Sequence, residues 1–260
     1  MAMRVEPIPA FEDNYIWLLR APEREAAVVV DPGDANPVIA RLERDGLRLA
    51  AILITHHHGD HIGGVSALRG RWPDTAVYGP RDERIRGLTQ LVAGGDRVDP
   101  PGLDQVFEVI EVPGHTATHI AYFGGGALFC GDTLFAAGCG RVFDGTFEDL
   151  GASLQRIAAL PAETLCYCAH EYTLANLGFA RWVEPDSAAL AAATTAAQAR
   201  RAAGVPTVPT SLGDELRVNP FLRTGEPAVV AAAERFAGAR LDGQVAVFTA
   251  LRRWKDERYD

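Results

Sequence analysis

The sequence predicts an α+β protein in which a strand-rich domain is followed by a smaller α-helical domain. Up to about residue 170, short runs of β-branched, aromatic and other apolar residues recur, and glycine, proline or aspartate closes most of them. Such runs are typical of strands. Beyond residue 170 they disappear, and patterns typical of helices, several of them alanine-rich, take their place. We therefore expect a first domain at residues 1–170 and a helical domain at residues 171–260.

The strands expected in the first domain are short and mixed with helices. In chain order they are "YIWLLR" (15–20), "AAVVVD" (26–31), "AAILIT" (50–55), "TAVYG" (75–79), "FEVIEV" (107–112), "HIAYF" (119–123), "ALFC" (127–130) and "LCYC" (165–168). Helical patterns lie between some of them, at residues 37–46, where Gly46 would end the helix, and at residues 149–161. This mixture predicts β-sheets covered by helices.

Four helices are expected in the second domain, at residues 172–183, 187–204, 226–238 and 244–259. The stretch between the second and the third, "VPTVPTSLGDELRVNPFLR", holds three prolines, and we expect it to run irregularly over the surface. On the last helix, one face carries Val245, Phe248, Arg252 and Lys255. The apolar pair would anchor that face to the domain, and the two cations would reach past it.

The bulk composition disfavours several classes of protein. A net charge of −9 repels phosphate backbones, so nucleic acid is not an expected partner. No apolar run is long enough to cross a bilayer, and the first 14 residues are too poor in apolar residues for a secretory signal. The four cysteines, Cys130, Cys139, Cys166 and Cys168, include no C-x-x-C pair, and we expect buried, reduced thiols. The cysteines predict a cytoplasmic protein, and we expect a monomer because nothing in the sequence suggests an obligate partner.

Four of the seven histidines fall within one short stretch, "HHHGDH". Alternate side chains of an extended segment share a face, so His56 and His58 would point the same way, with His57 opposite. The residues that follow look like a turn into a helix, which would place Asp60 and His61 in its first turn. One loop could therefore offer two pairs of ligands to two neighbouring metal ions.

Three further residues of the metal-binding type stand where a strand passes into a loop: His115, Asp132 and His170. Each of them alone is more often a turn former or a hydrogen-bond partner than a ligand. Together with the histidine stretch they predict a metal centre along one edge of a sheet system. His57 and His119 are expected outside the set of ligands, with His119 better suited to packing or to supporting a ligand.

The pattern T-H-x-H-x-D-H at residues 55–61, followed by His115, Asp132 and His170, resembles the metallo-β-lactamase superfamily. The resemblance implies an αββα sandwich, in which two β-sheets face each other and helices lie outside. It also implies two metal sites, with His56, His58 and His115 at one ion, Asp60, His61 and His170 at the other, and Asp132 bridging both.

Two divalent ions about 3.5–4 Å apart can share a water molecule and lower its pKa from 15.7 toward about 7. The expected reaction is therefore hydrolysis by a metal-bridging hydroxide, with Asp60 placed to orient it or to accept its proton. No serine nucleophile elbow is present, and the glycine run 124–126 lacks a P-loop lysine. Mixed imidazole and carboxylate ligands suit zinc, our first expectation, as well as iron or manganese.

Four longer segments narrow the substrate. They are "GDTLFAAGCGRVFDGT" (131–146), "AHEYTLANLGFA" (169–180), "GDELRVNPFLR" (213–223) and "LRRWKD" (251–256). Together they resemble the glyoxalase II (hydroxyacylglutathione hydrolase) family over essentially the whole chain, with a catalytic first domain and a substrate-binding helical domain. The resemblance implies hydrolysis of S-(2-hydroxyacyl)glutathione, chiefly S-D-lactoylglutathione, to a 2-hydroxy acid and glutathione, the second step of methylglyoxal detoxification.

The same resemblance implies the residues that bind the substrate. Arg141, Phe143 and Tyr172 would contact the glutathione moiety, and Arg252 and Lys255 would bind its glycine carboxylate. Charge-assisted hydrogen bonds of this kind contribute about 1.5–3 kcal/mol each. Lysine is common in the family at the position of Arg141, and tyrosine at that of Phe143, which lacks the hydroxyl. The alternative for the two cations of the last helix is that they only complement its dipole.

Other functions remain open at this stage. A mononuclear-iron persulfide dioxygenase shares the fold and acts on a glutathione derivative, and other thioester or lactone hydrolases belong to the superfamily. A nuclease of the superfamily is disfavoured by the acidic charge balance. A binding module without activity is disfavoured because all seven expected ligands are present. The number and kind of metal ions per chain would separate the two enzymes that act on glutathione derivatives.

Overall fold

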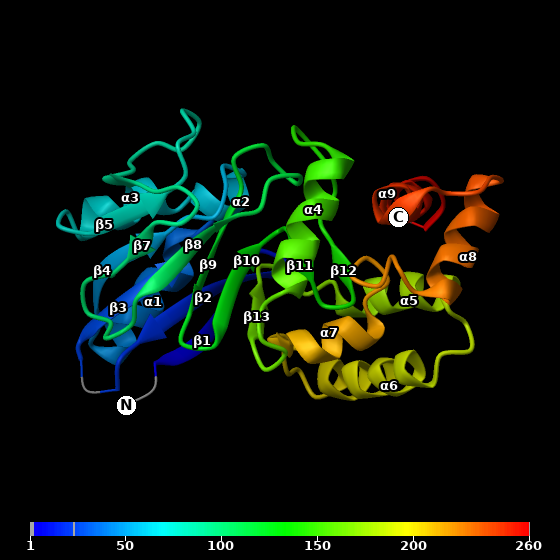
Figure 1. The fold of residues 1–260 in the computed structure, drawn as a ribbon. Coiled ribbons are helices and arrows are strands. Elements are labelled where there is room, and N and C mark those ends of the chain that lie inside the picture. Colours follow the sequence, from blue (N-terminus) through cyan, green and yellow to red (C-terminus); the bar gives the residue numbers. More distant parts are fainter. Residues whose placement is uncertain (1–2, 23, 260) are drawn as a thin grey trace. The chain divides into compact units, whose positions relative to one another are not determined.

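The computed structural model describes residues 3–22 and 24–259. Its chain folds into two compact units, each formed by two segments of sequence (Figure 1). The first unit comprises Met1–Glu111 and Thr118–Gly131, and the second comprises Val112–Ala117 and Asp132–Asp260. The division into domains at residue 170 stays a prediction.

The first unit contains a six-stranded sheet in the order β1-β2-β3-β4-β5-β6. Its strands are β1 (Arg4–Ala10), β2 (Asn14–Arg20), β3 (Ala26–Val30), β4 (Arg48–Leu53), β5 (Ala76–Gly79) and β6 (Gln90–Leu91). The first three strands pair antiparallel, and β3 to β6 pair parallel. No strand is predicted from the sequence at β1, whose segment contains two prolines. The structure shows why the prolines are tolerated: β1 is an edge strand, which has no ladder to complete on its outer side.

Helices cover one face of this sheet. They are α1 (Ala35–Asp45), α2 (Gly59–Ile62) and α3 (Val65–Arg71). The helix α1 ends at Gly46 in the left-handed conformation, as predicted. Buried residues of α1 and α3, among them Val38 and Leu68, form one apolar core with alternate residues of the strands, among them Val29 and Ile52.

The opposite face of the sheet is buried as well. Val28 and Ala51, which alternate with the residues of the helix-covered face, are fully enclosed. The first unit also contains the antiparallel strands β7 (Arg97–Val98), β8 (Phe107–Glu111), β9 (Ile120–Gly124) and β10 (Ala127–Gly131). Tyr122 of β9 donates a hydrogen bond of 2.9 Å to the carbonyl of Ile54, directly after β4. These strands therefore approach the first sheet where β4 gives way to the histidine loop.

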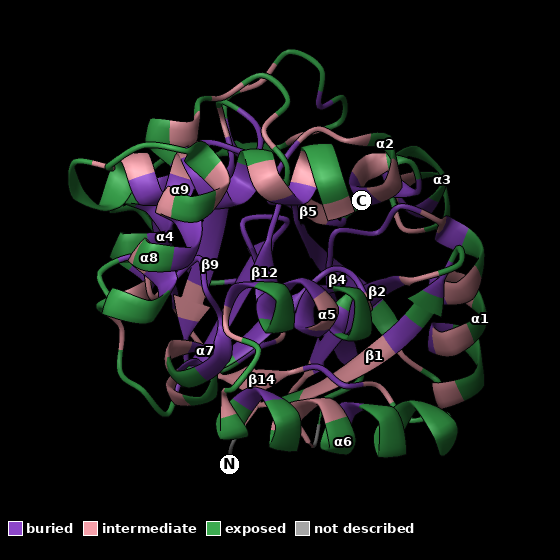
Figure 2. Cartoon of the chain, turned by 90° about the vertical axis from the view of Figure 1, so that its right-hand side faces the viewer, coloured by how far each residue is buried: buried purple, intermediate pink, exposed green. Residues whose placement is uncertain are grey.

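The second unit combines two short strand pairs with most of the helices. The strands are β11 (Leu134–Phe135) with β12 (Gly138–Cys139), and β13 (Leu165–Cys168) with β14 (Thr210–Ser211). The helices are α4 (Phe147–Ala158), α5 (Thr173–Val183), α6 (Ala188–Ala202), α7 (Leu212–Val218), α8 (Pro227–Ala237) and α9 (Gly243–Trp254), which continues as a π-helical turn, Lys255–Tyr259. The four helices predicted beyond residue 170 are all present. Figure 2 shows α6 largely exposed.

The stretch between α6 and α8 corrects a prediction. It does not run irregularly over the surface, because it forms β14 and α7 and buries Leu212, Glu215 and Phe221. Ser211 caps α7 by accepting a hydrogen bond of 3.1 Å from the backbone N–H of Asp214. A serine followed three residues later by an acid is a helix-start signal, and it outweighs the prolines, which all fall outside the helix.

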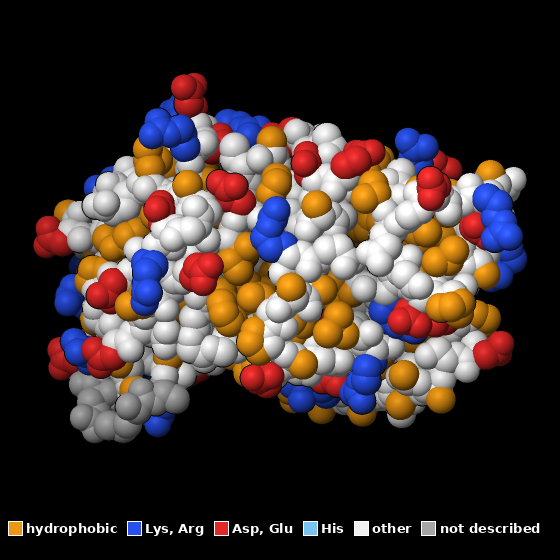
Figure 3. All heavy atoms as spheres, in the orientation of Figure 1, with side chains coloured by type: hydrophobic (Ala, Val, Ile, Leu, Met, Phe, Trp, Pro, Cys, Tyr) orange, Lys and Arg blue, Asp and Glu red, His pale blue; other side chains and the backbone are white. Residues whose placement is uncertain are grey.

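Other predictions from composition concern cysteines, membranes and nucleic acid. All four cysteines are free and buried, as predicted, and burial raises the pKa of the Cys139 thiol to about 11 and that of Cys168 to about 12. Among the described residues, no helix combines the length and the apolar character that a membrane span requires. On the face shown in Figure 3, acidic and basic side chains of the described residues are interspersed.

Candidate metal centre

The seven predicted ligands are divided between the two units. His56, His58, Asp60 and His61 belong to the first unit, and His115, Asp132 and His170 belong to the second. Both groups follow the rule seen in the sequence, since most of their members stand just after a buried strand. Each group has its own internal geometry.

The histidine loop leaves β4 as an extended chain and enters α2. His56 Nε2 and His58 Nδ1 lie 3.1 Å apart, so the two rings share one side of the loop as predicted. The Nδ1 atom of His57 lies 3.6 Å from a carboxylate oxygen of Asp82, outside this pair. In α2, His61 Nε2 lies 3.4 Å from Asp60 Oδ2. The loop therefore presents two ligand pairs.

Asp31, which is not among the residues predicted from the sequence, holds this loop in place through its carboxylate. Its buried carboxylate accepts hydrogen bonds from the backbone and hydroxyl of Thr55, at 2.8 and 2.7 Å, and lies 3.0 Å from His61 Nδ1. Because the Thr55 hydroxyl gives its hydrogen to Asp31, it accepts one from His56 Nδ1 at 3.0 Å. His56 Nε2 is then the basic nitrogen, the form that a ligand needs. One donor atom each of Asp31, His56 and His61 lies within 4.8 Å of the others.

A sequence signal for Asp31 did exist. It ends the strand pattern "AAVVVD", the same place that Asp132 occupies in "ALFCGD".

Two further residues contact Asp60. Asn14, at the start of β2, was also missed, and it donates a hydrogen bond of 3.0 Å to Asp60 Oδ2. A lone asparagine in a turn carries no comparable signal. The turn after Asp31 needs a glycine, because a Cβ on Gly33 would lie 1.9 Å from the carbonyl oxygen of Asp60.

His119 has the packing role expected for it. Its ring stacks on that of His56, with centroids 4.5 Å apart and an angle of 17° between the planes. Its Nδ1 donates a hydrogen bond of 3.0 Å to the carbonyl of Ile120, its own neighbour in the chain. His119 therefore holds the His56 ring flat against the end of β9.

In the second unit, Asp132 stands between two histidines. One carboxylate oxygen lies 3.5 Å from His115 Nε2, and the other lies 3.3 Å from His170 Nε2. His115 Nδ1 donates a hydrogen bond of 2.8 Å to the carbonyl of Arg141, which leaves Nε2 as the basic nitrogen. The His170 ring stacks on Tyr172, with centroids 4.7 Å apart and planes 5° apart. A carboxylate that offers one oxygen to each side has the form of a bridging ligand.

Both groups fit divalent metal ions by the chemistry of their donors. The Nδ1 atoms of His56, His61 and His115 each have an oxygen partner, the arrangement typical of metal-binding imidazoles. Buried imidazoles and carboxylates gathered in this way suit first-row divalent ions. The fold and these clusters indicate a divalent metal site.

Three predicted substrate residues keep exposed surface. The side chain of Arg141 is about half exposed, and its Nε lies 3.8 Å from Asp256. Phe143 is 64% exposed and meets the ring of His115 edge-on, with centroids 5.2 Å apart. Tyr172 is partly exposed beside His170. In the second unit, Phe143 and Tyr172 therefore lie beside the Asp132 group, and Arg141 approaches it through its backbone carbonyl, which binds His115.

Arg252 and Lys255 differ from the expectation that they reach outward. They are only 1% and 6% exposed. Arg252 donates hydrogen bonds of 3.0 Å to the carbonyl of Cys139 and 2.8 Å to Asp256. Phe248 is buried and anchors the helix as predicted, whereas Val245 is 45% exposed. The buried face of the last helix therefore contains Phe248 and the two cations, but not Val245.

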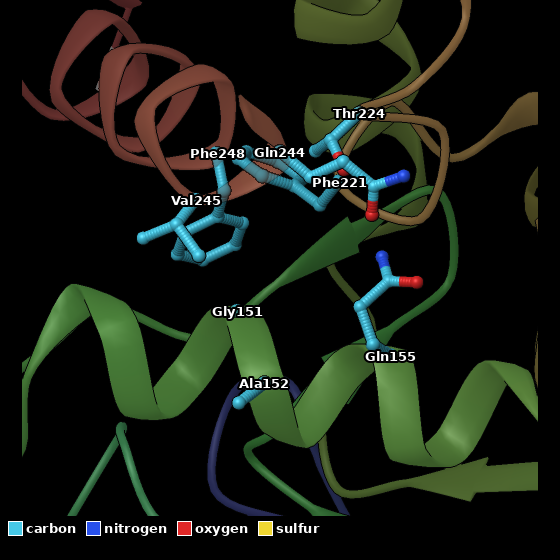
Figure 4. Close-up of a pocket in the computed structure, with 8 residues that line it drawn as sticks. All are labelled: Gly151, Ala152, Gln155, Phe221, Thr224, Gln244, Val245 and Phe248. Atoms are coloured by element: carbon cyan, nitrogen blue, oxygen red, sulfur yellow. The ribbon is translucent and has the colours of Figure 1, made fainter. Parts of the chain in front are cut away.

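A separate pocket of the second unit, of about 80 Å³, lies between α4 and α9 (Figure 4). It is lined by Gly151, Ala152, Gln155, Phe221, Thr224, Gln244, Val245 and Phe248. Figure 4 shows the amide of Gln155, on α4, pointing toward that of Gln244, on α9. None of the predicted substrate residues lines this pocket.

Comparison with known protein families covers nearly the whole chain. Residues 10–170 match the metallo-beta-lactamase superfamily, and residues 171–258 match the hydroxyacylglutathione hydrolase C-terminus. Together the two matches confirm the predicted fold class, a metallo-β-lactamase domain of sheets packed with helices, followed by a helical C-terminal domain. The chain is thus a member of the metallo-β-lactamase superfamily.

The most similar relatives that we report place the chain in one family of this superfamily. Hydroxyacylglutathione hydrolases from Xanthomonas axonopodis pv. citri and Alkalilimnicola ehrlichii are 54% and 57% identical to this chain, over 98% and 96% of it and 99% and 97% of their own length. The chain belongs to the hydroxyacylglutathione hydrolase (glyoxalase II) family.

Two solved structures share the fold at 26% identity. ETHE1 from Myxococcus xanthus has a TM-score of 0.68, with 100% of this chain and 93% of that one covered. TTHA1623, in a di-iron-bound form, has a TM-score of 0.61, with 84% of this chain and 100% of that one covered.

Proposed function

We propose that this protein is a metal-dependent thioesterase that hydrolyses S-(2-hydroxyacyl)glutathione, chiefly S-D-lactoylglutathione, to a 2-hydroxy acid and glutathione. The observation that carries the proposal is the match to hydroxyacylglutathione hydrolases at 48–57% identity over at least 96% of the chain. This match includes the helical region, which the superfamily match at residues 10–170 does not cover.

We infer that the seven predicted ligands hold two divalent ions, zinc in the first place. His56, His58 and His115 would bind one ion, Asp60, His61 and His170 the other, and Asp132 both. The donor chemistry of each group supports this division, and the similar structure TTHA1623 holds two irons. Two bound ions would supply a nucleophilic hydroxide at neutral pH and would stabilise the negative charge that develops on the thioester oxygen.

The protein's own side chains would orient the reaction. Asp31 and Thr55 fix the rings of His56 and His61. Asp60, with one oxygen bound by Asn14, would use the other to orient the attacking hydroxide or to accept the proton that a water molecule loses when this hydroxide forms. The thiolate of glutathione is a good leaving group, so no separate general acid is needed to complete the cleavage.

Recognition of the glutathione moiety would come from the second unit. Phe143 and Tyr172 have exposed surface beside the Asp132 group, and the side chain of Arg141 is about half exposed, so all three can contact the peptide. Phe143 would act through its ring. Arg252 and Lys255 would attract the glycine carboxylate, and because Asp256 already pairs with Arg252, the net positive charge available there is smaller than two cations suggest.

The proposal includes a cytoplasmic monomer that needs no nucleic acid, membrane or protein partner. Its acidic charge and four buried free cysteines agree with such a setting. Size-exclusion chromatography with light scattering would measure the mass of the particle. A mass near 28 kDa is expected from the 27.9 kDa chain, and a stable larger particle would refute the monomer.

Steady-state turnover of a substrate panel tests the proposed activity. The purified protein should hydrolyse S-D-lactoylglutathione faster than S-acetylglutathione, simple thioesters or lactones, and a chelator should abolish the activity. No turnover of any glutathione thioester by folded, metal-loaded protein would contradict the proposal. Oxygen uptake with glutathione persulfide, by protein holding one iron per chain, would instead establish the dioxygenase alternative.

A further inference from the structure

The hairpin of β11 and β12, residues 134–139, lies in the chain between Asp132 and Arg141. Only two residue pairs, Leu134 with Cys139 and Phe135 with Gly138, join its strands. So short a pairing cannot hold a hairpin in place by itself. At its turn, Ala137 has a φ of 55°, a conformation that residues with a side chain rarely adopt. Something outside the hairpin must therefore fix its shape.

Side chains from the helical region bind the hairpin backbone residue by residue. Glu215 Oε2 accepts a hydrogen bond of 2.8 Å from the N–H of Ala137. The side-chain amide of Asn219 donates to the carbonyls of Gly138 and Phe135, at 2.9 and 3.3 Å. Asn176 donates to the carbonyl of Ala136 at 3.1 Å, and Arg252 donates to that of Cys139 at 3.0 Å. We call Asn176, Glu215, Asn219 and Arg252 the hairpin clamp.

The clamp is buried and internally connected. All four side chains are almost completely enclosed, and Asn219 also donates a hydrogen bond of 3.0 Å to Glu215. A Cβ on Gly138 would lie 2.4 Å from the side chain of Asn176, so the hairpin fits against the clamp without space between them. Glu215 and Asn219 come from "GDELRVNPFLR", a segment that has no role in the proposed chemistry. A satisfied buried polar network fixes one geometry.

The residues at the two ends of the hairpin contact the Asp132 group directly, so the position of the hairpin determines that of the group. The N–H of Gly140 donates to the carbonyl of Thr133 at 3.3 Å. A Cβ on Gly140 would lie 2.0 Å from the carbonyl oxygen of Asp132 and 2.9 Å from His115 Nδ1, so the two ends pack directly together. The next carbonyl, that of Arg141, accepts the hydrogen bond from His115. A shift of the hairpin would therefore move Asp132 and release His115.

We propose that Glu215 and Asn219 are positioning residues, which act through the hairpin to set the Asp132 carboxylate and the backbone that orients His115. This inference rests on the proposed function for its catalytic consequence. It gives the helical region a second task besides carrying residues that bind glutathione, since it also shapes the ligand group of its own unit.

The test compares four variants with the wild-type holoenzyme. Glu215→Leu removes the acceptor for Ala137, and Glu215→Gln restores an acceptor of the same length. Asn219→Ser is too short to reach the two carbonyls. Asp214→Asn is the matched control, because it neutralises the neighbouring, exposed carboxylate of the same helix. The readouts are hydrogen exchange of the amides at residues 134–139, zinc affinity by chelator competition, and kcat and KM on S-D-lactoylglutathione.

We expect Glu215→Leu and Asn219→Ser to speed exchange of the hairpin amides at least tenfold and to weaken zinc binding and lower kcat about 10- to 100-fold. Glu215→Gln should recover most of each loss, and Asp214→Asn should match the wild type. Unchanged exchange in either folded variant, or faster exchange with wild-type zinc affinity, would overturn the proposal. If Glu215→Leu does not fold, Asn219→Ser and Glu215→Gln decide the question. Exchange and zinc affinity need no turnover, so they test the clamp even if the proposed substrate is wrong.

Discussion

Asp31 determines the state of two histidine rings through a single carboxylate. It binds Thr55 directly, which in turn accepts from His56, and it lies beside His61 Nδ1. A neutral amide of the same shape would keep the packing but lose the negative charge that favours the His61 proton on Nδ1. The identity of this one side chain therefore controls which nitrogen each ring turns toward a metal ion.

The corresponding prediction is that Asp31→Asn weakens metal binding about 10- to 100-fold and leaves the fold intact. Chelator competition on the purified variant measures the affinity, and far-UV circular dichroism checks the fold. Asp74→Asn, at an exposed position of the same unit, is the control. Wild-type metal affinity in Asp31→Asn would show that the carboxylate does not support the ligands.

Arg252 is the residue at which the structure changes an expectation most. A side chain expected to reach out toward substrate is instead enclosed between Cys139 and Asp256, with its guanidinium 5.4 Å from the ring centre of Phe221. Its removal leaves a buried carbonyl without its donor, which costs about 1–3 kcal/mol.

We therefore predict that Arg252→Ala raises KM about tenfold and also lowers the free energy of unfolding by about 1–3 kcal/mol. Steady-state kinetics and denaturant unfolding measure the two effects. Arg253→Ala is the control, because this neighbouring side chain of the same helix is exposed. If both variants changed KM equally, Arg252 would have no specific part in binding.

At the scale of elements, the helix α7 buries Glu215, and burial disfavours the ionised form of this carboxylate. Burial raises the pKa of Glu215 to about 7, although Thr210, Ala137 and Asn219 donate hydrogen bonds that oppose the shift. Asp214 on the same helix raises it further, and the thiols of Cys166 and Cys168 lie near it on β13. The folded state thus holds this proton more tightly than the unfolded chain does.

The sign of the pH effect follows from this shift. The stability gained by holding the proton is present below pH 4.5 and is lost as pH rises through about 7. Replacement by Gln removes the titration, so Glu215→Gln should gain on the order of 2–3 kcal/mol relative to the wild type between pH 5 and pH 8. Denaturant unfolding at both pH values measures the difference. A constant difference between the two proteins would contradict the raised pKa.

The elements show what local sequence can and cannot predict. The longer strands and helices were predicted because their apolar patterns are long and their ends carry glycine or proline, as at Gly46. β1 was missed because its prolines forbid a central strand, and only the order of the whole sheet makes it an edge. α7 was missed because its two turns are shorter than a periodic pattern needs, although Ser211 and Asp214 marked its start.

For the whole molecule, the sequence was enough to propose the metal ligands, but not to predict the residues that orient them. Histidines crowded into one loop are rare enough to indicate a metal site. Their pairing at His56 and His58 followed from the alternation of an extended chain. Asp31, Asn14 and the hairpin clamp act through contacts between residues distant in sequence, such as Glu215 with Ala137. No local pattern contains such a contact.

We propose that two ions bound by this chain activate the hydrolysis of a glutathione thioester. The most direct measurement is to remove the metal, return zinc in steps, and follow turnover of S-D-lactoylglutathione against the zinc bound per chain. We predict that turnover is absent in the metal-free protein and rises until about two ions are bound. Full activity with one ion, or none with two, would contradict the account.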